Sequence, residues 1–153
     1  MHEAFLRDNQ TLTQLQRQIA TSNELVSITA HPLSSPTKAG IIKFDDVAFS
    51  AGIKNLTTYK SSGKFICEKE GLYLISVSIR SLSNGAYFVI YQNSGLISYT
   101  EIGYNSDGGS MAHTGTVILA LQVHLNDSVW VYFPGAYRIK GGRWSTLTII
   151  KLR

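Results

Sequence analysis

The spacing of apolar residues divides the chain into two segments of different structure. In residues 3–27, apolar residues recur every seven positions at Phe5, Leu12, Ile19 and Val26, which predicts an amphipathic helix. Gln and Thr fill most other positions, and a helix so short and so poor in apolar residues is marginal alone. Two arrangements stay open: a short coiled coil between several copies, or a single helix lying on its own domain.

After residue 30 the apolar period changes to two, which indicates β-strands, and no later region has a helical pattern. Gly, Pro, Asn and Ser interrupt the alternation about every eight to twelve residues, as in antiparallel sandwiches. We therefore expect an all-β fold in which a helical segment, 1–25, precedes a globular domain, 26–153. The expected strands cover residues 41–49, 64–68, 71–80, 86–92, 96–102, 114–125, 128–133 and 144–152.

Three of these strands are apolar on both faces. An antiparallel sheet with one face in water should be polar on that face. Covering each extra Leu or Ile would contribute about 1.5–3 kcal/mol, so we expect neighbouring copies of the chain to cover this second face. The predicted interface consists of Leu72, Leu74, Ile118, Ile150 and Leu152.

Composition and charge narrow the classes of partner. The length of 153 residues fits one domain, and a net charge of +4 is too small to argue for nucleic acid. No apolar run reaches the length of a membrane span, so we expect no membrane insertion. The end of the chain is locally basic, which indicates either solvated strand ends or a patch that attracts anions. After Asp127 no acid occurs, whereas Arg138, Lys140, Arg143, Lys151 and Arg153 follow.

The sequence lacks the residue patterns of catalysis. No nucleophile elbow, phosphate loop or dinucleotide motif occurs, and the four histidines are not spaced as metal ligands. Asp45 and Asp46 are neighbours on a strand, so their side chains should point to opposite faces. Cys67 has no basic neighbour, and we expect a buried, unreactive thiol. We predict a protein that is not an enzyme and needs no cofactor.

Two loops combine aromatic rings with charged groups, and we predict that they bind a ligand. Aromatic faces stack on sugar rings and Arg pairs with carboxylates, so an acidic glycan is the expected ligand. Simpler roles stay open for His113, as a loop residue, and for Trp144, as a cover for the sheet. Asp107 and Asn105 could form a weak calcium site, although one carboxylate per chain is few for this ion. The candidates are Tyr104, Asp107 and His113 in loop 103–113, and Tyr137, Arg138, Lys140, Arg143 and Trp144 in and after loop 134–143.

Five short motifs in order resemble the globular head of complement C1q, a family whose domains share a fold with tumour necrosis factor (TNF). The motifs are "VSITA" at 26–30, Gly63-x-Phe65, Gly71-Leu-Tyr73 followed by alternation, the Asn126–Trp130 turn, and "STLTIIKL" at 145–152. The sequence departs from the family at Leu147 and Ile149, where the family has Phe and Gly, and it lacks the collagen-like repeat. With its short heptad segment and the stretch "GLYLISVSI" at 71–79, the chain most resembles head-domain proteins of bivalve molluscs.

This resemblance implies a ten-stranded jelly-roll sandwich, a tight homotrimer and a secreted protein. It also implies non-catalytic recognition of microbial surface glycans in innate immunity, and family members sometimes bind calcium near the trimer axis. Two other functions stay open: a cytokine-like ligand of a protein receptor, and a calcium-associated structural protein outside the cell.

Overall fold

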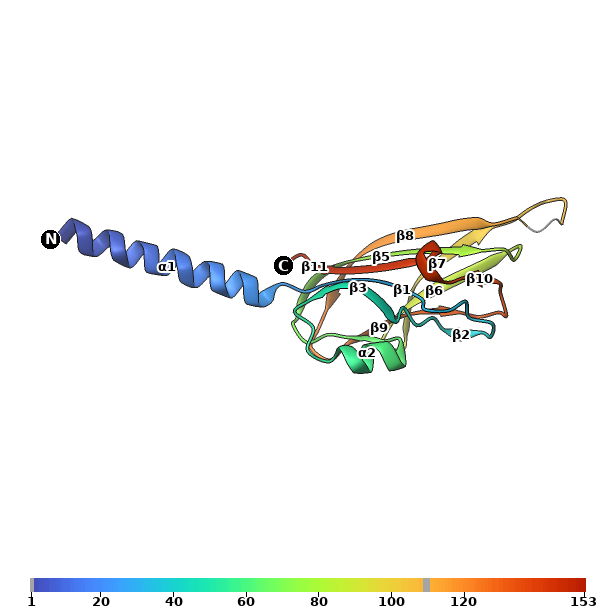
Figure 1. Ribbon diagram of the computed structural model, residues 1–153, viewed down its shortest axis with the longest axis horizontal. Coiled ribbons are helices and arrows are strands. Elements are labelled where there is room, and N and C mark those ends of the chain that lie inside the picture. Colours follow the sequence, from blue (N-terminus) through green and yellow to red (C-terminus); the bar gives the residue numbers. More distant parts are fainter. Residues whose placement is uncertain (1, 109–110) are drawn as a thin grey trace.

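A long helix projects from one end of a two-sheet sandwich in the computed structural model, which describes residues 2–108 and 111–153 (Figure 1). Helix α1, His2–Glu24, points away from the sandwich, so the arrangement with the helix lying on its own domain is wrong. Leu12 and Leu15 are exposed on α1, and a coiled coil between copies stays a prediction. Val26 was expected on the helix, but it lies beyond the helix and is buried in the sandwich core.

The first sheet, sheet A, is built around strand β5, Gly71–Ser81. Strand β8, His113–Val123, pairs with β5 along its whole length. The other edge of β5 pairs with β11 over residues 73–78 and then with the short β10 at residues 80–81. The remaining members are antiparallel neighbours of this set: β1 Ser27–His31 beside β11 Thr146–Lys151, β3 Asp46–Ala51 beside β1, and β10 Ile139–Lys140.

The second sheet, sheet B, packs against sheet A. Its strands are β2 Gly40–Ile41, β4 Phe65–Ile66, β6 Ala86–Gln92, β7 Gly95–Gly103 and β9 Ser128–Phe133. All its pairs are antiparallel, with β6 between β7 and β9. The jelly-roll sandwich is therefore confirmed. The described residues form eleven strands rather than ten, and three of them have only two residues, including β10 inside the expected loop 134–143.

The core lies between the two sheets and follows the predicted alternation. On β5, Tyr73, Ile75, Val77 and Ile79 are essentially inaccessible to solvent. Cys67 joins this core; its thiol lies 3.2 Å from the Lys69 carbonyl oxygen, and burial raises its pKa. The burial of Cys67 expected from the sequence is confirmed, and the low reactivity of its thiol stays a prediction.

A second helix, α2, Leu56–Ser62, contradicts the expectation that no helix follows residue 30. Asn55 caps its start, where the side-chain oxygen accepts a hydrogen bond from the Thr58 amide at 3.3 Å. Gly63 ends it with φ of 75°, and its amide donates to the Tyr59 carbonyl at 2.9 Å. Buried Tyr59 anchors the helix on the core, so packing and caps override the poor helix propensity of its Thr and Ser residues.

The expected single strand at 41–49 is also wrong, because the chain crosses between the sheets there. Strand β2 belongs to sheet B, and β3 begins only at Asp46 in sheet A. The crossing segment alternates, since Ile42 and Phe44 are buried in the core while Lys43 is exposed. A period of two therefore marks a buried connection here rather than one continuous strand.

Gly71 has a different structural role from the one its sequence suggests. A Gly before an alternating run predicts a tight turn. Gly71 instead begins β5, and a Cβ atom there would overlap the carbonyl oxygen of Arg153. The Leu72 amide donates to that same oxygen at 2.7 Å, so the missing side chain lets the end of the chain pair with β5.

Candidate functional site

The described parts of the two predicted ligand loops lie at the end of the sandwich farthest from α1 (Figure 1). The turn at 82–85, between β5 and β6, holds both of them. Towards loop 134–143, the Leu82 amide donates to the Arg138 carbonyl at 3.0 Å, and the Arg138 amide donates to Ser83 Oγ at 2.8 Å. Towards loop 103–113, the Asn105 amide donates to Asn84 Oδ1 at 3.0 Å.

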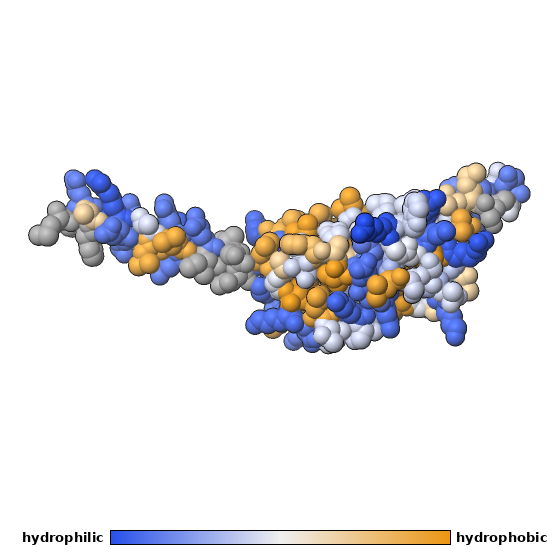
Figure 2. Space-filling model, viewed as in Figure 1, coloured by the Kyte–Doolittle hydropathy of each residue, from blue (hydrophilic) through white to orange (hydrophobic). Residues whose placement is uncertain are grey.

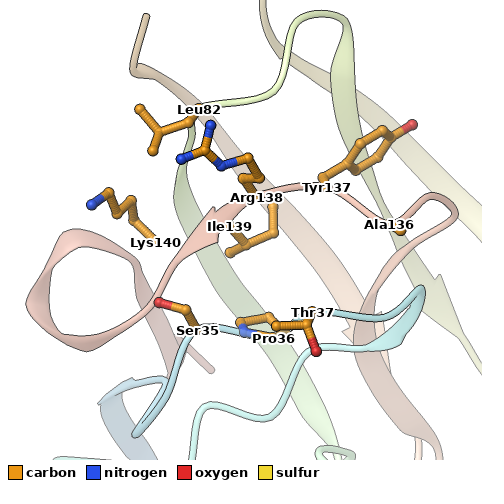
Figure 3. A pocket seen from close by; sticks show the side chains of 9 residues that line it. All are labelled: Ser35, Pro36, Thr37, Leu82, Ala136, Tyr137, Arg138, Ile139 and Lys140. Carbon is orange, nitrogen blue, oxygen red and sulfur yellow. The ribbon is translucent and has the colours of Figure 1, made fainter. Parts of the chain in front are cut away.

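A hollow of about 300 Å³ opens beside this turn, and three predicted residues line it: Tyr137, Arg138 and Lys140. Figure 3 shows the charged groups of Arg138 and Lys140 on the side of Leu82, opposite the segment at 35–37. Ile139 lies between the two cations in the sequence and is buried, because β10 turns it into the core. The hollow thus combines an apolar base with two cationic side chains at its rim.

Tyr137 lies at the edge of the hollow, with its ring turned away from Arg138 (Figure 3). Burial raises the pKa of this phenol, so it stays neutral at physiological pH and can donate a hydrogen bond. Its ring also packs against Phe133, at 6.5 Å between centroids, which fixes it to the core. The residue can therefore present one ring edge and one hydroxyl to a ligand.

Arg143 and Trp144 do not line the hollow. They belong to the short 3-10 turn Gly142–Trp144, and the Trp144 ring is 59% exposed. The guanidinium carbon of Arg80 lies 4.2 Å from the centre of that ring, so Trp144 stacks on a cation of the outward row of β5, and its role as a cover for the sheet stays open. Arg80 pairs with Lys140 across β5 and β10, which adds a third cation near the hollow.

Sequence reasoning missed Arg80. The alternation of β5 could have pointed to it, because Arg80 is the one charged residue in an outward row whose other members are Leu or Ser. Only the pairing of β5 with β10 shows that this row ends next to Lys140.

Tyr104, Asp107 and His113 also lie outside the hollow. Tyr104 is exposed, and His113 Nε2 lies 3.2 Å from Asn105 Oδ1, so this histidine helps to hold its own loop. In residues 2–108 and 111–153, no three His, Cys, Asp or Glu side chains gather as metal ligands would. A weak calcium site shared between copies stays a prediction.

The five predicted interface residues share the outer face of sheet A. Ile150 lies opposite Leu74 in the register, and the Leu152 amide donates to the Leu72 carbonyl at 2.7 Å. Ile118, on β8, is 63% exposed. Figure 2 shows apolar residues gathering at the end of the sandwich next to α1, whereas the opposite end is more hydrophilic.

The middle of the same outer face is lined by hydroxyl groups, which the sequence argument did not foresee. Thr29 and Thr148 are hydrogen bonded at 3.1 Å, and Thr116 donates to Ser78 at 3.0 Å. The expectation of a second apolar face therefore holds near the chain ends but not along the whole of sheet A.

The two-sheet jelly-roll sandwich is the fold of the C1q and TNF type. The C1q domain model matches residues 25–148, so the chain belongs to the C1q domain family. Domains of this family are generally non-enzymatic binding proteins that are typically secreted, form trimers, and bind ligands or receptors. No curated protein matches the chain.

Solved structures with the same fold come from both branches of this type. Murine APRIL at pH 5.0 has a TM-score of 0.67 and 11% identity, covering 84% of this chain and 99% of its own. The globular domain of zebrafish complement 1qA has a TM-score of 0.60 and 14% identity, covering 84% and 96%. The Eiger TNF of S. frugiperda has a TM-score of 0.57 and 14% identity, covering 85% and 94%. At these identities the likeness shows the fold alone.

Within the described part of the chain, no helix combines the length and the apolarity that crossing a membrane requires.

Proposed function

We propose that this protein is a secreted, homotrimeric recognition protein of innate immunity that binds acidic glycans of microbial surfaces without catalysis. The observation that carries the proposal is the hollow at the loop end, where Arg138 and Lys140 stand over an apolar base beside Tyr137. Arg presents a planar pair of donors that matches a carboxylate, and Lys adds a point charge. The resemblance of residues 71–79 to bivalve head-domain proteins supports the immune setting.

The size of the hollow fits a small ligand unit. About 300 Å³ is the lower end of the range for small-molecule sites, which suits one charged sugar rather than a peptide or a nucleotide. A single shallow site of this kind would bind weakly. Three copies held in one trimer would gain affinity on a repetitive surface through effective concentration.

The proposal is tested with a glycan array that carries neutral, sialylated and uronic acid-containing glycans. The purified trimer should bind acidic glycans, and an engineered monomer should bind the same ones more weakly. The Arg138→Ala and Lys140→Ala double variant should lose this binding, whereas Lys54→Ala, which removes an exposed cation elsewhere, should keep it. Failure of the trimer to bind any polysaccharide or bacterial surface would contradict the lectin function.

A cytokine-like ligand is the second candidate, because APRIL and the Eiger TNF share the fold of this chain. In that function the grooves between subunits would engage a protein receptor, and the array would show no sugar binding. Capture of one defined membrane protein that depends on the trimer would support it. A calcium-associated structural protein, with Asp107 and Asn105 supplying oxygens, would instead give a calcium signal in calorimetry.

A further inference from the structure

The outer face of sheet B carries five aromatic side chains, which have no role in the proposed function. Tyr87 and Tyr91 on β6, Tyr99 on β7, and Trp130 and Tyr132 on β9 all point away from the core, opposite to buried Phe88, Ile90 and Val131. We name these five residues the aromatic face. The chain has only eight tyrosines and two tryptophans, so half of its tyrosines are placed on this one surface.

Ring contacts connect the aromatic face into two groups. Tyr91 stacks on Trp130 with centroids 5.3 Å apart and planes at 17°, and Tyr132 meets Tyr91 edge to face at 6.1 Å. Tyr87 and Tyr99 lie 6.2 Å apart in the second group. Val89 joins the groups, because it pairs with Tyr132 on one side and Tyr99 on the other.

The aromatic face is continuous with the hollow through Tyr137. The Tyr137 ring lies 6.2 Å from the ring of Tyr87, and Tyr137 also lines the hollow that contains Arg138. A ligand that enters the hollow can therefore extend from Tyr137 onto Tyr87 and then onto Tyr99, which is 67% exposed.

The hollow and the aromatic face differ in the charged groups beside them. The hollow has Arg138 and Lys140 at its rim, whereas the charges set beside the aromatic face are Glu101, opposite Tyr87 in the register, and Lys64, with its Nζ 4.3 Å from the centre of the Trp130 ring. The charge set beside Tyr87, on the side of the face next to the hollow, is therefore acidic, and Lys64 lies with the other ring group. Rings arranged side by side on a sheet suit the flat C–H faces of pyranose sugars.

Aliphatic residues, by contrast, gather on the outer face of sheet A. The two outer faces are on opposite sides of the sandwich, so copies that assemble through sheet A leave the aromatic face open to solvent.

We infer that the aromatic face extends the ligand site, and that the ligand is an acidic polysaccharide chain rather than a single charged sugar. One acidic unit occupies the hollow at Arg138 and Lys140, and the following sugars stack on Tyr137, Tyr87 and Tyr99. This inference rests on the proposed function, because the acidic unit in the hollow sets where the chain starts.

The test compares short and long fragments of the same acidic polysaccharides. Fragments of about two and about ten sugars from hyaluronan, alginate and polygalacturonate serve as probes, and the full chain is titrated with each by calorimetry. The short fragment is on the order of the size of the hollow, and the long one can also reach Tyr87 and Tyr99 on the aromatic face. We expect the long fragment of at least one probe to bind about 3- to 10-fold more tightly than its short fragment, as one or two stacked rings would provide. Tyr99→Ala should reduce that gain and leave the affinity of the short fragment unchanged.

Tyr99→Phe is the matched control, because it keeps the ring and loses only the hydroxyl; it should retain the gain. Bridging of neighbouring subunits by a long fragment would also favour length, but that effect would survive Tyr99→Ala. Equal affinities for both lengths, or a gain that Tyr99→Ala leaves intact, would overturn the inference while the proposed function stands. If the unmodified chain binds no fragment of either length, the proposed function fails and the inference fails with it.

Discussion

Ile118→Asp is the sharpest test of assembly through the outer face of sheet A. Among the five predicted interface residues, Leu72, Leu74 and Ile150 are partly buried within the single chain, so a charge there would also disturb the fold. Ile118 is 63% exposed in the single chain and contributes little to its core. A substitution at such a position usually changes the stability of the chain by no more than about 0.5 kcal/mol.

The expected effect on the trimer is much larger. Fully burying an isoleucine side chain contributes about 1.5–3 kcal/mol, so covering the exposed part of Ile118 contributes about 1–2 kcal/mol for each chain. Three chains lose about 3–6 kcal/mol, which lowers the association constant by about two to four powers of ten. Each carboxylate removed from water costs several kcal/mol more. We therefore expect Ile118→Asp to be a folded monomer at micromolar concentration.

Sedimentation velocity distinguishes the states, because the chain has a mass of 16.9 kDa and a trimer would have about 51 kDa. Leu125→Asp is the matched control: Leu125 is 59% exposed, nearly as much as Ile118, but it lies in the turn after β8, outside the sheet. The control should sediment as a trimer. A trimer of Ile118→Asp with unchanged affinity, or a monomer of the unmodified chain, would refute assembly through this face.

Three further predictions concern single residues. Because burial raises the pKa of the Cys67 thiol, a thiol-reactive dye should label the folded chain far more slowly than the urea-unfolded chain, and equal rates would contradict the buried position. Asn55→Ala should lower the free energy of unfolding in urea by about 1 kcal/mol through loss of the α2 cap, whereas Thr57→Ala in the same exposed turn should not lower it. The hydrogen bond to the Glu70 carboxylate raises the pKa of His124, so an NMR titration should give a midpoint above 6.5 that returns towards 6.5 in Glu70→Gln. Since the folded-state pKa is the raised one, the stabilisation is complete below pH 6.5 and lost as the pH rises through the folded value; a midpoint at or below 6.5 would exclude the pair.

The inner faces of the sheets could be predicted from sequence because burial there depends on one strand at a time. The row from Tyr73 to Ile79 alternates strictly, and each inward residue is buried whichever strand lies beside it. Where helix caps or a crossing of the chain between the sheets determine the structure, the spacing of apolar residues does not predict it. Asn55 and Gly63 marked the ends of α2 in the sequence, yet seven residues rich in Thr and Ser carry no apolar helical pattern.

Surfaces built from several strands were predictable only in part. The Leu and Ile residues of the outer face of sheet A broke the expected polar pattern, so they were visible strand by strand. The aromatic face was not, because Tyr91 and Trp130 are far apart in the sequence and become neighbours only through the register of β6 with β9. The same reason hid Arg80, whose partner Lys140 belongs to a strand of two residues.

The apolar residues of sheet A and the hollow lie towards opposite ends of the sandwich. Helix α1 joins the sandwich at the end where the C-terminus and the apolar residues of Figure 2 lie, and Lys151 pairs there with Glu24 of α1 at 3.1 Å. Strand β10, whose residues Ile139 and Lys140 line the hollow, lies towards the opposite end. Parallel copies that associate at the α1 end would therefore direct three hollows the same way and leave them uncovered. Because weak sites gain from effective concentration only when they can engage one surface together, this polarity supports the proposed function of a trimer that binds glycans.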